Sequence, residues 1–327
     1  MPKVSVIIPV FKVEKYIGKC AKSLLNQTLD DIEYIFIDDC TPDNSIDILR
    51  EIVEQFPSRR EMIRIEKMPT NSRQAAVRCF GMQLATGDYV IHCDSDDWVD
   101  LDYYEKLYNK AIEDDADVVF APIVDEYTES SILRKMNTPN NIGKEIVINW
   151  YGTNTAMYLW NKLVKRSIYT ENHILPFEGV NMWEDNGLML RILYHAKRVS
   201  YISGPAYHYN HTNMGAMTAS YGRSAVEQML KCANLLDKFF SEKNDAQEYV
   251  KTVNAVKYLA KLNLITTDYK GIRVFKQIYP ESNEAANYIS LDAFSIKGKI
   301  RFFFVKYHFA WLFVTLFKCI TFFTKNK

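Results

Sequence analysis

The chain has 327 residues, 48% of them hydrophobic, and its 40 basic and 40 acidic side chains give a formal net charge of zero. This length and composition support a large core, and the balanced charge argues against a nucleic-acid-binding protein. Six cysteines without any CxxC spacing argue against a zinc site or a disulfide framework and are typical of a cytoplasmic protein.

The first 124 residues alternate between apolar runs of strand length and helical patterns. The N-terminus enters the first strand at once, so we expect no signal peptide. The predicted strands are 4–10, 33–39, 62–68, 89–93 and 116–124, and the predicted helices are 14–28, 44–56, 74–86 and 101–113. Buried strands separated by helices predict an α/β fold with a mostly parallel sheet flanked by helices.

The pattern weakens from residue 125 to 160, which we interpret as loops and an irregular insert. Short strands are predicted at 199–203 and 206–211, and long helical patterns follow from about residue 223. We therefore expect a domain at 1–220, a C-terminal helical extension at 221–295 and a basic, aromatic tail at 296–327.

Two acidic clusters directly follow predicted strands. Asp38 and Asp39 close the second strand, and Asp94, Asp96 and Asp97 close the fourth. Ligands of such sheets bind outside the carboxyl ends of the strands, so both clusters should face one rim. An Asp-x-Asp pair there suits Mg²⁺ or Mn²⁺, which takes one or two carboxylates and shares substrate phosphates. The chain has no glycine-rich phosphate loop, so the cation would have to neutralise a diphosphate.

Each cluster also has a simpler explanation. Residues 94–97 could form a solvated turn, and we expect Asp100 to cap the helix that follows. Asp38 and Asp39 could merely end a strand before the turn residues of "TPDNS". At the rim, however, Asp39 could accept a hydrogen bond from the N3–H of uracil, and we favour this base contact.

"WEDNGLMLRIL" predicts a helix that begins near Glu184 and Asp185. A carboxylate at a helix N-terminus stays ionised and can accept a proton, so Asp185 is a candidate general base. Capping of the first turn is the alternative.

Two aromatic pairs are weaker candidates. Trp160 and Trp183 could stack on sugars, although lone tryptophans more often pack in the core. His208 and His211 lie three residues apart on a predicted strand and point to different faces, so at least one of them should be structural.

The residues after Asp292 include seven basic side chains and no acidic one. As a helix, the uncharged segment 307–317 would span about 16 Å, short of the roughly 30 Å hydrocarbon core of a bilayer. The mixture of aromatic and basic residues favours attachment to the membrane interface through 297–327, although the basic residues do not collect on one helical face. A buried core helix and a spanning helix with snorkelling lysines are the alternatives.

Four ordered segments resemble motifs of the family-2 glycosyltransferases, which have the Rossmann-like GT-A fold. "VSVIIPVFKVEKYIGKCAKSLLNQTLDDIEYIFIDDCTPDNS" is similar to the first motif and "NSRQAAVRCFGMQLATGDYVIHCDSDDW" to the central one. "YLWNKLVKRSI" and "WEDNGLMLRILYHAKRVSYIS" resemble the acceptor-side motifs. The resemblance covers about residues 3–215.

On the donor side, the resemblance implies roles for five residues. Pro9 and Phe11 would line the nucleoside pocket, and Asp39 would contact uracil. Asp94 would lie nearer the ribose and share the metal, and Ser95 would also contact the donor.

For the metal and the chemistry, the resemblance implies that Asp96 is the direct metal ligand. Arg78 would hold the diphosphate or the aspartate cluster. Asp185 would be the general base, with Glu184 beside it. The chain departs from the usual pattern at Lys12, where Asn is common, and at Cys79, which follows Arg78 in place of Asn.

These implications describe an inverting, metal-dependent hexosyltransferase. It would move a sugar from a nucleotide-sugar, expected to be a UDP-sugar, to a hydroxyl of a glycan or lipid-linked acceptor in surface polysaccharide synthesis, at the cytoplasmic face of the membrane. One alternative is a sugar-1-phosphate nucleotidyltransferase, but "PVFKVEKY" lacks the glycine-rich loop expected of it. The other is a glycan-binding scaffold without activity.

Overall fold

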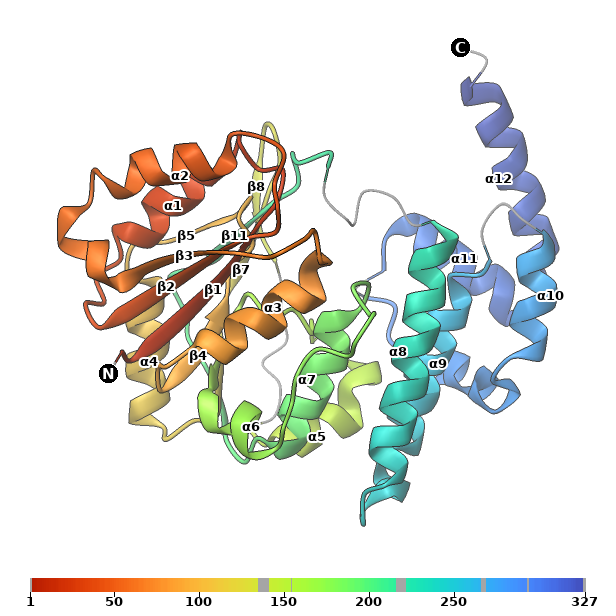
Figure 1. Ribbon diagram of the computed structural model, residues 1–327. Coiled ribbons are helices and arrows are strands. Elements are labelled where there is room, and N and C mark those ends of the chain that lie inside the picture. The colour runs from red at the N-terminus through yellow and green to blue at the C-terminus, as the bar shows by residue number, and fades with distance from the viewer. Residues whose placement is uncertain are drawn as a thin grey trace. The chain divides into compact units, whose positions relative to one another are not determined.

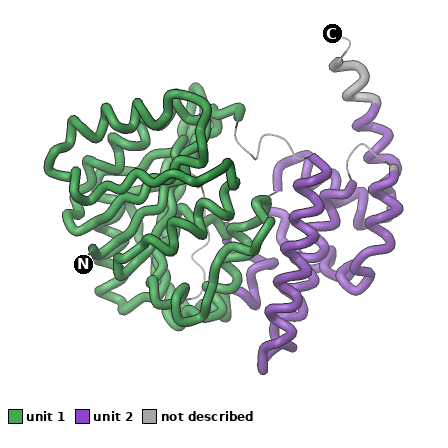
Figure 2. The backbone as a smooth tube through the Cα atoms, viewed as in Figure 1, with its two compact units in different colours: residues 1–146, 156–220 green, residues 147–155, 221–327 purple. Residues whose placement is uncertain are grey.

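The computed structural model describes residues 2–134, 141–153, 155–215, 222–265, 269–292 and 294–325. The chain divides into two compact units, residues 1–146 with 156–220 and residues 147–155 with 221–327 (Figure 2). The boundary predicted at residue 220 lies outside the described residues. The second unit also takes in 147–155, which the sequence pattern assigned to the first.

A seven-stranded sheet forms the centre of the first unit, in the order β10-β6-β9-β4-β1-β2-β3 (Figure 1). Its strands pair in parallel except at β9, which runs antiparallel to β4 and β6. The predicted α/β fold with a mostly parallel sheet is therefore confirmed. The strands are β1 (Val4–Val10), β2 (Ile32–Asp38), β3 (Ile63–Lys67), β4 (Tyr89–His92), β6 (Val118–Phe120), β9 (Lys162–Lys165) and β10 (Val199–Tyr201).

A second, four-stranded sheet has the order β5-β11-β7-β8. The strand predicted at 116–124 is in fact two strands in different sheets, because Pro122 separates β6 from β7 and has no N–H to donate to a ladder. The region 125–160 is more regular than expected, since it contains β8 and helix α5 (Gly143–Asn149). The strands of this sheet are β5 (Trp98–Val99), β7 (Ile123–Glu126), β8 (Ser131–Leu133) and β11 (Tyr207–Asn210).

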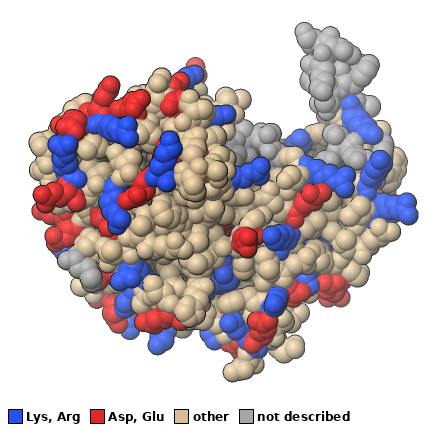
Figure 3. All heavy atoms as spheres, viewed as in Figure 1, with Lys and Arg blue, Asp and Glu red and all other residues tan. Residues whose placement is uncertain are grey.

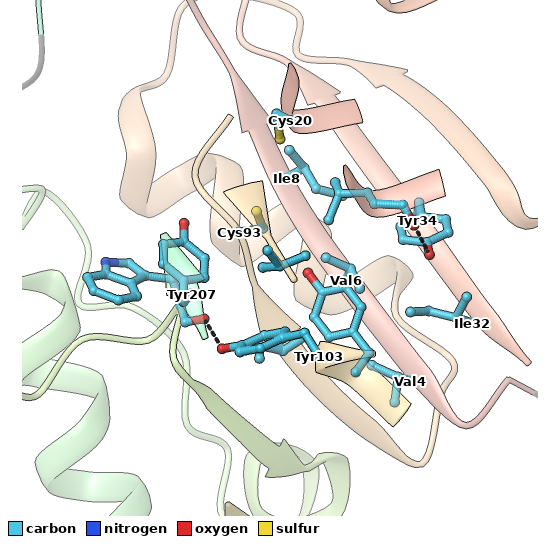
Figure 4. Packing of buried hydrophobic residues seen from close by; sticks show 14 of the residues in the cluster. Val4, Val6, Ile8, Cys20, Ile32, Tyr34, Cys93, Tyr103 and Tyr207 are labelled. Atoms are coloured by element: carbon cyan, nitrogen blue, oxygen red, sulfur yellow. Dashed lines mark hydrogen bonds between the residues drawn. The ribbon is translucent and has the colours of Figure 1, made fainter. Parts of the chain in front are cut away.

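The central strands are buried on both faces, and alternate side chains point to opposite helix layers. Val4, Val6 and Ile8 of β1 pack in one cluster with Tyr34 of β2 and Tyr103 (Figure 4). Helices α1 (Ile17–Leu25), α2 (Ser45–Val53) and α4 (Tyr103–Glu113) supply the rest of that layer. The intervening side chains, such as Ile7, face α3 (Arg73–Leu84) on the other side. Helices α6 (Arg166–Glu171) and α7 (Glu184–His195) complete the unit.

The topology brings the two acidic clusters to one rim. Strands β2 and β4 both pair in parallel with β1, one on each side. Their carboxyl ends therefore lie at the same edge of the sheet, with the end of β1 between them.

The second unit is helical and has its own core, built mainly from α9, the residues around Ala285, α11 and α12. Across the described residues, no helix is long and apolar enough to cross a bilayer. The helices are α8 (Arg223–Ser241), α9 (Val250–Leu262), α10 (Tyr269–Gln277), α11 (Ile296–Lys306) and α12 (Ala310–Lys325).

Candidate active site

Buried hydrogen bonds to β11 fix the turn that follows β4. Asp97 is 1% exposed, and its carboxylate accepts hydrogen bonds from the Tyr207 hydroxyl (2.7 Å) and the Asn210 backbone N–H (2.8 Å). The Asp94 backbone N–H donates to the same Tyr207 hydroxyl (3.0 Å). Burial and the charges of Asp96 and Asp94 raise the pKa of Asp97 well above its usual range. Asp97 therefore shapes the turn rather than meeting a ligand.

Asp94 and Asp96 lie on the partly exposed side of this turn. Arg78 Nη2 is 2.7 Å from Asp94 Oδ1, and Asn213 Nδ2 donates to Asp96 Oδ2 over 2.7 Å. Burial and the charge of Asp94 raise the pKa of Asp96 to about 6, so a bound cation would relieve an unfavourable ionisation. Two carboxylates suit Mg²⁺ or Mn²⁺. Over the described ranges, no three His, Cys, Asp or Glu side chains converge, so a cation would also need substrate oxygens.

Ser95 and Asp100 belong to the same turn and the loop that follows it. Ser95 lies within the turn but is only 5% exposed, so its side chain has little surface to offer a nucleotide-sugar. The prediction that Asp100 caps the following helix is wrong, because α4 begins at Tyr103. The Asp100 carboxylate instead accepts from the Ala206 backbone N–H (2.8 Å) and lies 3.1 Å from His208 Nε2, which ties the loop to β11.

Asp39 follows β2 and is 4% exposed. Its Oδ1 accepts from the Ser72 backbone N–H (2.6 Å), and its Oδ2 accepts from the Arg73 backbone N–H (2.9 Å) and from Asn71 Nδ2 (3.2 Å). Burial raises the pKa of Asp39, and the two backbone donors oppose that shift. The structure thus fixes this carboxylate against the start of α3. A contact with a nucleobase would have to use the remaining lone pairs of its oxygens.

Pro9 and Phe11 lie at the end of β1, on the same rim. Pro9 is partly exposed, and Phe11 is 39% exposed with Lys12 Nζ 5.3 Å from its ring centre. Lys12 has φ = 55°, the left-handed region in which Asn is tolerated better than Lys. Arg73 and Trp183 also have positive φ, at 67° and 69°. Such strained backbone is found most often near functional sites.

Arg78 links the turn after β4 to the start of α7. Its side chain comes from α3 and is 1% exposed. Nη2 pairs with Asp94, and Nε lies 3.7 Å from Glu184 Oε1. Within the described part of the chain, Nε and Nη1 donate no hydrogen bond. The guanidinium is therefore a buried cation shared by two acids, and it can act on a bound ligand through its charge and through the position it gives Asp94.

Glu184 and Asp185 begin α7, as predicted. Burial and the charge of Asp185 raise the pKa of Glu184 to about 8, so Glu184 is largely protonated at neutral pH. Burial also raises the pKa of Asp185, but the Asn186 backbone N–H, which donates over 2.7 Å, and the charge of Arg78 oppose this. Asp185 is only partly buried. Of the two acids, Asp185 is the one suited to accept a proton at neutral pH.

Lys162 lies in the segment "YLWNKLVKRSI", but no local pattern in the sequence assigns it a role. It is 1% exposed, and its Nζ donates to the Tyr158 carbonyl (2.6 Å) and to Asn161 Oδ1 (2.7 Å). Burial lowers its pKa well below the usual value, while the charge of Asp185 raises it. A buried amine in the field of the candidate base is a feature that only the fold reveals.

Three of the four weaker candidates, Trp160, His208 and His211, pack against or pair with other protein side chains. Trp160 is 5% exposed, and its ring stacks on that of Tyr207 with centroids 4.3 Å apart. His208 and His211 each lie 2.7 Å from a carboxylate oxygen, of Glu126 and Asp125 respectively.

Known proteins agree with this architecture. Residues 5–172 match the family described as Glycosyl transferase family 2. The chain is 30% identical to EpsH of Bacillus subtilis over 259 residues, which cover 77% of this chain and 73% of EpsH. It is also 30% identical to the cholesterol galactosyltransferase of Borreliella burgdorferi over 315 residues, which cover 85% of this chain and 86% of the relative.

A solved structure shares the fold. The crystal structure of S. aureus TarS 1-349 in complex with UDP-GlcNAc superposes with a TM-score of 0.68 at 17% identity, covering 96% of this chain and 90% of TarS 1-349. The resemblance noted in the sequence is therefore confirmed: the chain belongs to glycosyl transferase family 2 and is a glycosyltransferase with the GT-A fold.

Proposed function

We propose that the protein is an inverting glycosyltransferase that moves a sugar from a UDP-sugar to an acceptor hydroxyl. The observation that carries this proposal is the pair of contacts made by Arg78. Its buried guanidinium binds Asp94 of the Asp-x-Asp turn and faces Glu184, next to Asp185. The donor side and the candidate base thus belong to one charged cluster.

The donor would lie across the carboxyl ends of β1, β2 and β4. Pro9 and Phe11 would line the nucleoside pocket, Asp39 would face the base, and the turn around Ser95 would approach the ribose and diphosphate. UDP-GlcNAc in the TarS complex supports a UDP-sugar for this chain. Asp96, with Asp94, would hold Mg²⁺ or Mn²⁺, which supplies positive charge to the departing diphosphate.

In the transfer step, the acceptor oxygen attacks the anomeric carbon from the face opposite the diphosphate. The bond from that carbon to the diphosphate oxygen breaks, and its electron pair leaves with UDP. Asp185 takes the proton of the acceptor hydroxyl, so charge is conserved. Arg78 stabilises the growing negative charge near Asp94. Glu184, protonated and beside Arg78, cannot substitute for Asp185 as a base at neutral pH.

The acceptor would be a glycan or a lipid-linked oligosaccharide of a surface polysaccharide. The Borreliella relative is named for transfer to cholesterol, which supports an acceptor with a lipid portion. We place the reaction in the cytoplasm, at the inner face of the membrane, where such acceptors present their hydroxyls.

A screen of nucleotide-sugars for release of UDP, with and without Mn²⁺, tests the proposal. We expect release from at least one UDP-sugar, dependent on the cation, and a product of inverted anomeric configuration by NMR. Release from no UDP-sugar, or a retained configuration, would contradict it.

Asp185→Asn separates the base from donor binding. We expect kcat to fall by roughly 10²- to 10⁴-fold because the proton acceptor is lost, while UDP still binds with its wild-type Kd. Glu184→Gln is the matched control at the neighbouring position and should lower kcat by a much smaller factor. Equal losses in the two variants would assign the effect to the helix start rather than to proton transfer.

A further inference from the structure

Helix α11 presents a continuous apolar stripe to solvent. Ile296, Ile300, Phe303 and Tyr307 follow one another at intervals of four, three and four residues, the spacing of one helix face. These side chains are 79%, 41%, 56% and 52% exposed. The rings of Phe303 and Tyr307 lie 4.7 Å apart, so the stripe is a formed surface.

The opposite side of the helix pair is anchored. Phe302 and Val305 of α11 and Phe313 and Val314 of α12 are buried in the core of the second unit. The core therefore does not need the exposed stripe, which is available for another partner. Phe309 and Trp311, 51% and 55% exposed, add aromatic side chains where α12 begins.

Lysines border this stripe on both sides. At 100° per residue, Lys299 and Lys306 fall on one flank of the Ile296–Tyr307 stripe and Lys297 on the other. Among the described residues, Lys299 and Lys306 form no ion pair, and the sequence has no acidic residue after Asp292. Figure 3 shows basic side chains gathered over α10 and the nearby part of α12.

We propose that this face docks on an anionic lipid bilayer, with α11 lying in the interface plane. The docking face consists of the apolar residues Ile296, Ile300, Phe303 and Tyr307 and the flanking Lys297, Lys299 and Lys306. Aromatic and aliphatic side chains enter the headgroup boundary, and the lysines reach anionic headgroups. The basic residues of α11 do not share one helical face, as noted from the sequence, but three of them border the apolar stripe.

A membrane suits this face better than a second copy of the chain. In a two-fold dimer through the stripe, each lysine flank would meet the same positive flank of its partner, which is unfavourable. The inference does not depend on the proposed transfer reaction, since binding to lipid is measured without turnover.

Co-sedimentation of the full chain with vesicles tests this docking face. We expect the protein to bind vesicles of phosphatidylcholine with phosphatidylglycerol, and high salt to weaken that binding. Phe303→Glu should weaken it at least tenfold, because the charge lies in the centre of the stripe. Lys299→Gln with Lys306→Gln should weaken it roughly 30-fold, from about 1 kcal/mol for each lysine.

Matched controls carry the same changes elsewhere. Ile112→Glu places a charge at an apolar residue of α4 that is 56% exposed. Lys231→Gln with Lys238→Gln removes two exposed lysines of α8. Both variants should bind vesicles like the wild type. Circular dichroism and thermal unfolding check that each variant folds. The proposal is overturned if Phe303→Glu binds like wild type, if vesicles of phosphatidylcholine alone bind equally well, or if no vesicle binds. It is also overturned if sedimentation shows a dimer that Phe303→Glu converts to a monomer.

Discussion

At the scale of single residues, the site is governed by one buried cation and the acids around it. Arg78 is almost fully buried and contacts Asp94 and Glu184, while Asp185 lies next along α7. Three acids in this space cannot all ionise at low cost around a single guanidinium. Glu184 accommodates the excess by keeping its proton, which leaves Asp185 as the acid with freedom to act as a base.

The raised pKa of Glu184 predicts how stability depends on pH. Its folded pKa of about 8 lies above the ordinary 4.5, so the folded state holds a proton that the unfolded chain releases. The contribution of this proton to the free energy of unfolding is fully present below about pH 4.5. It is lost as the pH rises through about 8. Glu184→Gln cannot lose this proton. We therefore expect the unfolding midpoint of the variant to exceed that of the wild type by a margin that grows from pH 5 to pH 8, because each pH unit in between costs the wild type about 1.4 kcal/mol.

Scanning calorimetry without ligands at several pH values measures this difference. Glu129→Gln, on an exposed turn, is the matched control and should track the wild type throughout. Parallel curves for Glu184→Gln and wild type would show that Glu184 ionises normally and would remove the argument for its protonated state.

The sequence predicts some residues of the candidate site but not the contacts that hold them. The Asp-x-Asp turn and Glu184-Asp185 could be predicted because they follow or precede strong strand and helix patterns. The partners that hold them could not. Tyr207 donates to Asp97 across 110 positions in the chain, and Asn213 reaches Asp96 across 117. No local pattern reports a contact of that separation, so the roles of Tyr207, Asn213 and Lys162 emerge only from the fold.

At the scale of elements, helix α3 places Arg78 and approaches the sheet very closely. A Cβ built on Gly81 would lie 2.5 Å from Ile7 Cγ2 and 2.9 Å from Ile37 Cδ1. Gly81 therefore sets the distance between α3 and the strands β1 and β2. The same helix carries Arg78 one turn earlier, so this spacing also sets where the guanidinium meets Asp94.

Two glycines in helices predict opposite effects of the same substitution. Helix propensity alone favours alanine over glycine by about 1 kcal/mol. Gly18→Ala in α1 should therefore stabilise by roughly 0.5–1 kcal/mol, because its new Cβ would meet only Ile48 Cγ2 at 3.9 Å. Gly81→Ala should instead destabilise by about 1–3 kcal/mol, since overpacking outweighs propensity. Urea unfolding measures both, and a stabilised Gly81→Ala would refute the close approach of α3.

The sequence predicts most strands of the central sheet, including the short β4 and β10, but it misses β9. The runs that became β1, β2 and β4 are mostly apolar because helices cover both faces. In contrast, β9 has four residues, two of them lysine, and inserts antiparallel between β4 and β6. Its pairing depends on partners far along the chain, so the antiparallel strand inside the central sheet and the pairing of the second sheet could not be deduced from periodicity.

For the whole molecule, the formal net charge is zero, but the candidate active site has an excess of acidic side chains. The formal charges cancel over 327 residues, yet Asp39, Asp94 and Asp96 follow neighbouring strands at one rim, and Arg78 links Asp94 to Glu184, beside Asp185. A donor and its cation would bring charges of both signs into that rim. Ligand binding should therefore appear as a change in the stability of the folded protein.

We expect UDP with Mn²⁺ to raise the unfolding midpoint and neither ligand alone to match the effect. At a ligand concentration of 100 times Kd, the gain is about 2.7 kcal/mol.

Asp96→Asn should change both the stability of the free protein and its response to the ligands. Its free form should be at least as stable as wild type at pH 7.5, because the pKa of Asp96 is raised to about 6 and its ionisation is costly. The amide oxygen can still accept from Asn213, so folding is preserved. The stabilisation by UDP and Mn²⁺, however, should be lost, because the neutral amide binds a hard cation weakly. Asp102→Asn, just before α4, should keep both the wild-type stability and the response. If Asp96→Asn retained full protection by UDP and Mn²⁺, the carboxylate would not be a metal ligand, and the cation would have to bind through other groups at the rim.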